Sequence, residues 1–161
     1  MKPALRKCGL GSPVVGIRST AVPDSLLLIG ENLHWSTPVR AELTLDVLTE
    51  LEQRAWRAIM LESSIARSFY ETVLDDQIVV LLADQPPIQE REAALAALCG
   101  EKWEACRLDG LNAKRLSPMV GFASYGIVAI RCGAPYSARA CSIYVRRDDG
   151  WKLRFHQRAR R

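Results

Sequence analysis

Beyond Trp103 the sequence shows no helical period, and this change limits the folds that the chain can adopt. Four strand-like runs follow at 104–117, 119–131, 137–147 and 151–158, with turn residues between them. Amphipathic helical patterns dominate the part before them. Helices that come first and antiparallel strands that come last are typical of an α+β fold, and they exclude the alternation of a parallel α/β sheet.

Three helices and one strand are predicted before this region. The segment TLDVLTELEQRAWRAIMLES (44–63) repeats apolar residues at helical spacing. This stripe consists of Leu48, Leu51, Ala55 and Ile59. Two shorter helices are predicted at 63–74 and 89–100, with a serine at the start of the first and Gly100 at the end of the second. The apolar run QIVVLLAD (77–84) predicts a buried strand between them.

The last two runs predict a hairpin whose register follows from its turn. Asp148-Asp149-Gly150 suits a three-residue loop closed by glycine, which places Arg147 opposite Trp151 and Ser142 opposite His156. One predicted face is apolar and consists of Ile143, Val145, Trp151, Leu153 and Phe155. The other predicted face consists of Ser142, Tyr144, Arg146, Lys152, Arg154 and His156. A two-residue loop would mix the two sets, because a shift of one residue turns a strand over.

The two ends of the chain differ from its body in charge and composition. The net charge is +4, and the basic excess lies in 1–20 and 146–161 while the part between is mildly acidic. Residues 1–42 hold many of the prolines and show no sustained period, so we expect a loosely ordered arm there. We expect the folded domain to occupy 43–161.

The chain has five cysteines and two histidines, but their spacing matches no zinc-binding pattern. We therefore expect reduced thiols, no metal and no cofactor, in a cytoplasmic protein. No apolar run has the length of a signal peptide or of a membrane helix, so no membrane association is expected.

Several segments resemble the SnoaL-like part of the nuclear transport factor 2-like superfamily. They are FYETVLDDQIVVLLAD (69–84), EREAALAAL (90–98), PYSA (135–138) and SIYVRRDDGWKLRFHQ (142–157). The resemblance covers about residues 44–158. It implies a cystatin-like cone, in which a curved mixed or antiparallel sheet wraps around three N-terminal helices and leaves a pocket. It also implies frequent homodimers.

The resemblance does not extend to the chemistry of one group of relatives. Ketosteroid isomerases of this superfamily carry a base aspartate in the first strand after the double aspartate, and Leu81 stands at that position here. A leucine cannot take up a proton, so isomerase chemistry of that kind is not expected.

His156 is the candidate general acid or base, because an imidazole titrates near neutral pH. Tyr144 and Ser142 lie on the same predicted face and are its candidate hydrogen-bond partners. The alternative is that His156 bonds Ser142 or the backbone in a purely structural role. Asp75 and Asp76 are further candidates, and the alternative for them is a turn before the strand.

Four aromatic side chains are candidates to line a ligand pocket, since such sites combine apolar rings with a few polar groups. They are Trp56, Tyr70, Trp103 and Tyr125. The alternative is that they belong to the core. Cys99 and Cys141 are weaker candidates for nucleophiles, because no basic group is predictable beside them.

Three functions remain open. The first is binding of an unknown small molecule in a largely apolar pocket, with proton transfer or hydration and dehydration near a carbonyl as its chemistry. The second is a non-catalytic module that carries a ligand or dimerises through its outer sheet face. The third is weak binding of anions or nucleic acid by the arginines of the C-terminal hairpin, for which a solvated hairpin edge is the alternative.

Overall fold

The computed structural model describes residues 38–100 and 103–160, so most of the predicted arm at 1–42 lies outside the described residues. Its helices are α1 (Pro38–Leu61), α2 (Ser63–Val73) and α3 (Arg91–Cys99). Its strands are β1 (Leu74–Leu82), β2 (Trp103–Ser117), β3 (Val120–Arg131), β4 (Ala134–Arg147) and β5 (Gly150–Arg160). The α+β class is confirmed. None of these helices is both long and apolar enough to cross a membrane.

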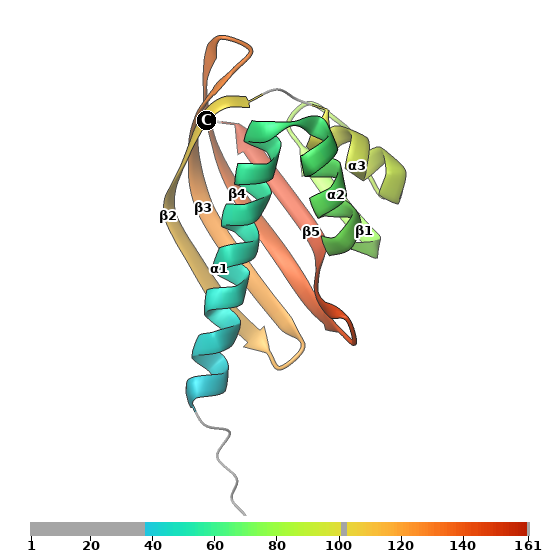
Figure 1. Ribbon diagram of the computed structural model, residues 1–161, viewed down its shortest axis with the longest axis vertical. Helices are drawn as coiled ribbons and strands as arrows, with labels where there is room; N and C mark the ends of the chain where they lie inside the picture. Colours follow the sequence, from blue (N-terminus) through green and yellow to red (C-terminus); the bar gives the residue numbers. More distant parts are fainter. Residues whose placement is uncertain (1–37, 101–102, 161) are drawn as a thin grey trace, which may run out of the picture. The chain divides into compact units, whose positions relative to one another are not determined.

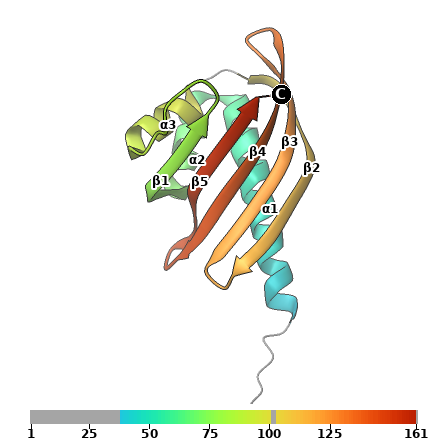
Figure 2. The ribbon, with the colours of Figure 1, turned by 180° about the vertical axis from the view of Figure 1, so that it is seen from behind.

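The strands form one mixed sheet in the order β1-β5-β4-β3-β2. β1 runs parallel to β5, and the other neighbours are antiparallel. α1 and α2 cover one face of this sheet, and α3 packs against α2 and β1 (Figure 1). Seen from behind, the other face carries no described helix (Figure 2). The buried residues therefore lie between the helices and one face of the sheet.

Two element boundaries differ from the sequence-based expectation. α1 begins at Pro38, before the predicted start, since a proline is tolerated in the first turn of a helix. β1 begins at Leu74, which pairs with Leu153 of β5. Asp75 and Asp76 therefore lie inside the strand, and the alternative that placed them in a turn before it is wrong.

The register of the C-terminal hairpin is confirmed in part. Ser142 lies opposite His156 as predicted, but Arg147 lies opposite Gly150, so the turn consists of Asp148 and Asp149 alone. The predicted three-residue loop is wrong.

An irregularity further along β5 reconciles these two facts. Tyr144 pairs with Leu153 while Ile143 pairs with Phe155, so Arg154 is an extra residue in β5. A bulge of this kind reverses the alternation of a strand. The side chains of Trp151 and Leu153 therefore point inward with that of Tyr144. The prediction that they share one face with Phe155 is wrong.

Candidate functional site

The most buried acidic side chain of the described residues is Glu52 in α1, which is 2% exposed. It lies one helical turn after Leu48 and one turn before Ala55 and Trp56, all of which face the sheet. Because of its position on this face of the helix, the Glu52 carboxyl group lies in the interior among apolar neighbours. A buried polar group of this kind requires hydrogen-bond partners.

Two tyrosines on neighbouring strands supply such partners. The Tyr125 hydroxyl of β3 donates to Glu52 Oε2 at 2.6 Å, and the Tyr144 hydroxyl of β4 donates to Oε1 at 3.0 Å. Trp56 Nε1 donates to the Tyr125 hydroxyl at 2.9 Å, which leaves the hydrogen of that hydroxyl for Glu52. Both carboxyl oxygens of Glu52 are thereby held from the sheet side.

Ser142 and His156 extend the cluster on its β4–β5 side. The Ser142 side chain is also hydrogen-bonded to Glu52, and its Oγ lies 3.0 Å from His156 Nδ1. A hydroxyl has one hydrogen to donate. If Ser142 gives it to Glu52, the Nδ1 nitrogen of His156 must carry the hydrogen that Ser142 accepts. We call the six residues that these bonds connect the Glu52 cluster: Glu52, Trp56, Tyr125, Ser142, Tyr144 and His156.

The cluster favours a protonated carboxyl group. Burial raises the pKa of Glu52 above its ordinary value of 4.5, although its three hydrogen bonds oppose the shift. No described lysine or arginine forms an ion pair with it. Burial and the nearby Glu52 carboxylate also raise the pKa values of Tyr125 and Tyr144. Burial therefore favours the protonated form of all three groups.

His156 is held as a neutral imidazole. It is 5% exposed, and burial together with the positive charge of Arg158 lowers its pKa to about 3. The imidazole therefore stays uncharged over the whole physiological range, in contrast to the titration near neutral pH that suggested it as a candidate. Its contact with Ser142 suits it to orient the cluster.

An aromatic layer lies beside the cluster. Trp56 and Trp103 meet edge to face with ring centres 5.2 Å apart, and Trp103 meets Tyr136 in the same way at 5.0 Å. Trp103 is 2% exposed, and its Nε1 has no hydrogen-bond partner among the described residues. Tyr70 is also buried, and burial followed by the Glu52 charge raises its pKa.

The structure brings most of the candidate residues of the sequence together. His156, Tyr144 and Ser142 belong to the Glu52 cluster with two of the four predicted pocket residues, Trp56 and Tyr125. Tyr70 and Trp103 are buried next to it.

Glu52 is not among the candidate residues predicted from the sequence, although its position in the helical pattern could have indicated it. It stands at i+4 from Leu48, on the same helical stripe as Ala55 and Ile59, where a charged residue is out of pattern.

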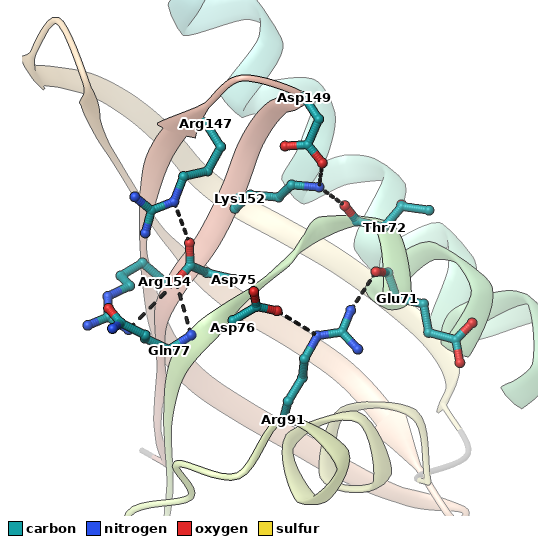
Figure 3. A network of polar contacts seen from close by, with 10 residues as sticks. All are labelled: Glu71, Thr72, Asp75, Asp76, Gln77, Arg91, Arg147, Asp149, Lys152 and Arg154. Atoms are coloured by element: carbon teal, nitrogen blue, oxygen red, sulfur yellow. Dashed lines mark hydrogen bonds and ion pairs between the residues drawn. The ribbon is translucent and has the colours of Figure 1, made fainter.

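The second buried acidic group, Asp75, has a different environment. Arg147 Nε lies 2.8 Å from its Oδ2, Arg154 lies 3.7 Å from its Oδ1, and the Gln77 backbone N–H donates to Oδ1 at 3.1 Å (Figure 3). Asp76 points outward and lies 3.8 Å from Arg91. Arg147 and Arg154 thus join the hairpin to β1.

The described residues also form several hollows. One of about 520 Å³ lies on the uncovered sheet face, where Tyr125 contributes to its wall. Another of about 590 Å³ lies between α1 and α2, and a third of about 220 Å³ lies where β1 and β5 end. His156, Trp56, Tyr70 and Trp103 line none of these three.

Neither metal ligands nor activated thiols accompany the cluster. No three His, Cys, Asp or Glu side chains gather at a possible metal site in the part of the chain that is described. Burial raises the pKa of Cys99 to about 11, and it also raises the pKa of Cys141. A raised pKa disfavours the reactive thiolate.

Several solved structures have a fold similar to that of this chain. An NTF2-like protein from Cytophaga hutchinsonii aligns with a TM-score of 0.62 and 16% identity over 72% of this chain and 97% of its own. A candidate ketosteroid isomerase from Parabacteroides distasonis aligns with a TM-score of 0.59 and 10% identity, over 72% and 86%. The association domain of CaMKII from C. elegans aligns with a TM-score of 0.62 and 8% identity, over 74% of this chain and 98% of its own.

This chain has the NTF2-like fold. An NTF2-like protein with a cystatin-like fold from Novosphingobium aromaticivorans aligns as well, which confirms the cystatin-like architecture. The resemblance found in the sequence is confirmed at the level of the fold. No protein-family model and no curated protein matches the chain.

Proposed function

We propose that this domain binds a small molecule and exchanges a proton with it near a carbonyl group, with Glu52 as the acid or base. The observation that carries the proposal is a carboxyl group 2% exposed, held by three hydrogen bonds and without an ion pair among the described residues. Burying an ionisable group without a counter-charge costs stability. Groups of this kind are concentrated at functional sites.

The Glu52 cluster suits proton transfer for a physical reason. A catalytic acid is most effective when its pKa lies near the working pH, and burial shifts Glu52 in that direction. Tyr125 and Tyr144 donate their hydroxyl hydrogens to Glu52, so they would stabilise the negative charge that remains on its carboxyl group after it gives a proton to the ligand. Ser142 and the neutral His156 would keep the carboxyl group oriented. Glu52 would thereby supply the proton-transferring group that Leu81 cannot.

Trp103 offers a route to the buried cluster. Its ring contacts Trp56, which donates to Tyr125, and it also contacts Tyr136, which lines the 220 Å³ hollow. The Trp103 indole N–H has no described partner, so a change of its rotamer breaks no hydrogen bond to a described residue. A ligand that enters at this hollow would displace this ring to reach Glu52.

The test measures proton exchange directly. Cyclohexanone is incubated with the full chain in D₂O, and deuterium uptake at the carbon beside the carbonyl is followed by NMR. Glu52→Gln should lower the rate above background by about 100-fold or more, as expected for loss of a general acid or base. Glu50→Gln is the matched control, because Glu50 lies on the same helix but is exposed. Equal rates for the wild type and Glu52→Gln would contradict the proposal.

A second candidate function is self-association through the uncovered sheet face. Neighbouring strands place apolar side chains there in one row, Val79, Phe155, Ile143 and Phe122. Val128 and Ile130 on the same face are 48% and 42% exposed. The hollow on this face also carries both Asp109 and Arg139, so a second copy related by a two-fold axis can offer each side chain an opposite charge.

Sedimentation equilibrium tests this second function. The wild type should behave as a dimer, and Ile130→Lys should shift it towards the monomer. Val47→Lys is the control, because Val47 is 39% exposed but lies on α1. A monomeric wild type, or an equal loss of dimer in both variants, would contradict association through this face.

A further inference from the structure

The groove of about 590 Å³ between α1 and α2 lies apart from the Glu52 cluster. α2 returns alongside α1 after the single connecting residue Glu62, so both helices contribute to its wall (Figure 1). Most of its lining side chains are exposed, and none of them lines another hollow of the described residues. The groove is therefore a separate surface feature of the helical layer.

One end of the groove is apolar. Leu61 ends α1 and Ile65 lies in the first turn of α2, and their side chains are 67% and 44% exposed. Ala58 lies one helical turn before Leu61 and lines the same groove with a small side chain. Single exposed apolar side chains are common on protein surfaces, but neighbouring ones in a concave space indicate a surface that a ligand or partner covers.

The other end of the groove is basic. Arg54 stands seven residues before Leu61 on α1, which is a distance of roughly 10 Å along the helix. Its guanidinium group lies 5.7 Å from the centre of the Phe69 ring of α2. Stacking on a ring restricts the plane of a guanidinium group and leaves its edge available for hydrogen bonds. The groove thus holds an oriented donor at this end.

A second arginine stands beside the first. Arg57 Nη2 donates to the neutral Gln53 Oε1 at 3.2 Å, and neither Arg54 nor Arg57 forms an ion pair with a described residue. No carboxyl group lines the groove in the described part of the chain. Glu62 stands at the apolar end, where its Oε2 accepts a hydrogen bond of 3.4 Å from Ser64. An anionic group is therefore attracted to the basic end and repelled at the apolar end.

We propose that this groove binds a fatty carboxylate, with its head group on Arg54 and Arg57 and its alkyl chain over Leu61 and Ile65. The planar fork of a guanidinium matches the two oxygens of a carboxylate. The apolar chain would cover the exposed side chains, and charge complementarity sets its direction. A stable protein interface needs about 800 Å² on each partner, much more than a strip of roughly 10 Å offers. The site does not depend on proton transfer at Glu52.

Isothermal titration of the full chain with octanoate and dodecanoate, below their micelle concentrations, tests the site. Each added methylene should raise the affinity by up to about fourfold, because it buries further apolar surface. Dodecyltrimethylammonium has the same chain with a positive head group and should bind at least about tenfold more weakly. If it binds as tightly as dodecanoate, or octanoate binds as tightly as dodecanoate, the proposal is overturned.

Two leucine variants separate the groove from general adsorption on apolar surface. Leu61→Ser should weaken dodecanoate binding about fivefold, because it removes the apolar contact at the end of the groove. Leu116→Ser is the matched control, since Leu116 is 59% exposed on β2 but does not line the groove. Both side chains are exposed, so both variants should fold. An equal loss of affinity in the two variants would overturn the proposal.

Two arginine variants test the head group. Arg54→Gln should weaken dodecanoate binding about tenfold, because it removes a charged donor. Arg146→Gln is the control, since Arg146 is also exposed and lies 5.8 Å from the Trp151 ring but outside the groove. An unchanged affinity of Arg54→Gln, or an equal loss in Arg146→Gln, would contradict the site.

Two further measurements exclude other occupants and other sites. Glu52→Gln should bind dodecanoate as the wild type does, which distinguishes failure of this site from failure of the proposed chemistry. A loss of binding in Glu52→Gln would place the ligand at the Glu52 cluster and overturn the proposal. Leu61→Ser should also leave the sedimentation equilibrium of the chain unchanged. A shift towards the monomer would show that a second copy covers the groove, which would likewise overturn it.

Discussion

Glu52 and Asp75 are two carboxyl groups that are buried to nearly the same degree, 2% and 4% exposed, and they have opposite electrostatics. Glu52 meets hydroxyl groups, and burial raises its pKa. Burial acts on Asp75 in the same direction, but the hydrogen bonds from Arg147 and Gln77 and the charges of Arg147 and Arg154 outweigh it and lower its pKa. Asp75 remains ionised because two arginines stabilise its carboxylate, and no described lysine or arginine does the same for Glu52.

This difference separates two roles. A carboxylate paired with arginines contributes to stability, because it joins β1 to the C-terminal hairpin. A carboxyl group surrounded by hydroxyl donors contributes little to stability and retains the ability to exchange a proton. Each role can be tested by changing one partner at a time.

The largest effect is expected at Asp75. Asp75→Ala removes the shared partner of two arginines, and we expect the free energy of unfolding at neutral pH to fall by about 2–4 kcal/mol. Urea denaturation measures the change. Asp76→Ala is the control, since the Asp76 side chain is adjacent in sequence but 97% exposed, and it should leave the unfolding curve unchanged. Equal losses in both variants would show that Asp75 is not the structural member of the pair.

A smaller loss is expected at the hydroxyl donors of Glu52. Tyr144→Phe leaves Glu52 Oε1 without its tyrosine donor, which should cost about 1–3 kcal/mol of unfolding free energy. Loss of this bond should also raise the pKa of Glu52 further, because the bond lowers it in the wild type. Tyr136→Phe on the same strand is the control, since its hydroxyl forms no hydrogen bond with a described residue. An unchanged Tyr144→Phe would mean that the cluster does not depend on this donor.

The pH dependence of stability should have opposite signs at the two sites. The folded state binds the Glu52 proton more tightly than the unfolded state, so stability should fall as pH rises above 4.5 towards the raised pKa. The slope is at most about 1.4 kcal/mol per pH unit for one group. Asp75 should instead lose its contribution as pH falls below 3.8 through its lowered pKa. Urea denaturation at several pH values measures both.

Two variants test the two parts of this pH dependence separately. Glu52→Gln should remove the fall above pH 4.5, and Asp75→Asn should remove the loss on the acid side. If Glu52→Gln leaves the slope as it is in the wild type, the carboxyl group of Glu52 has no raised pKa.

The smallest effect is expected at the bulge. Arg154 lies 3.7 Å from Asp75 and its side chain is 34% exposed, so Arg154→Gln should change stability by no more than about 0.5 kcal/mol. Differential scanning calorimetry is sensitive enough to compare it with Arg147→Gln, which removes the closer contact and should have the larger effect. The reverse order would assign the pairing of Asp75 mainly to the bulged residue.

Local pattern was sufficient to predict the element types and much of the candidate cluster. The change of period near Trp103 placed the helices and strands. The pairing of Ser142 with His156 was predicted from a three-residue loop, and it holds because the extra residue Arg154 offsets the shorter turn. The inward turn of Trp151 and Leu153 could not be predicted, because the local sequence pattern does not show that Arg154 is an extra residue in β5.

The sequence by itself determined the order of the elements, because hydrophobic periods of helices and strands act within a few residues. Only the tertiary structure decided that Glu52, Tyr125, Tyr144 and Ser142 meet, since their hydrogen bonds join α1 to β3 and β4 across long stretches of chain. It also decided the opposite pKa shifts of Glu52 and Asp75, because the charge state of a buried carboxyl group depends on which partners the fold brings to it.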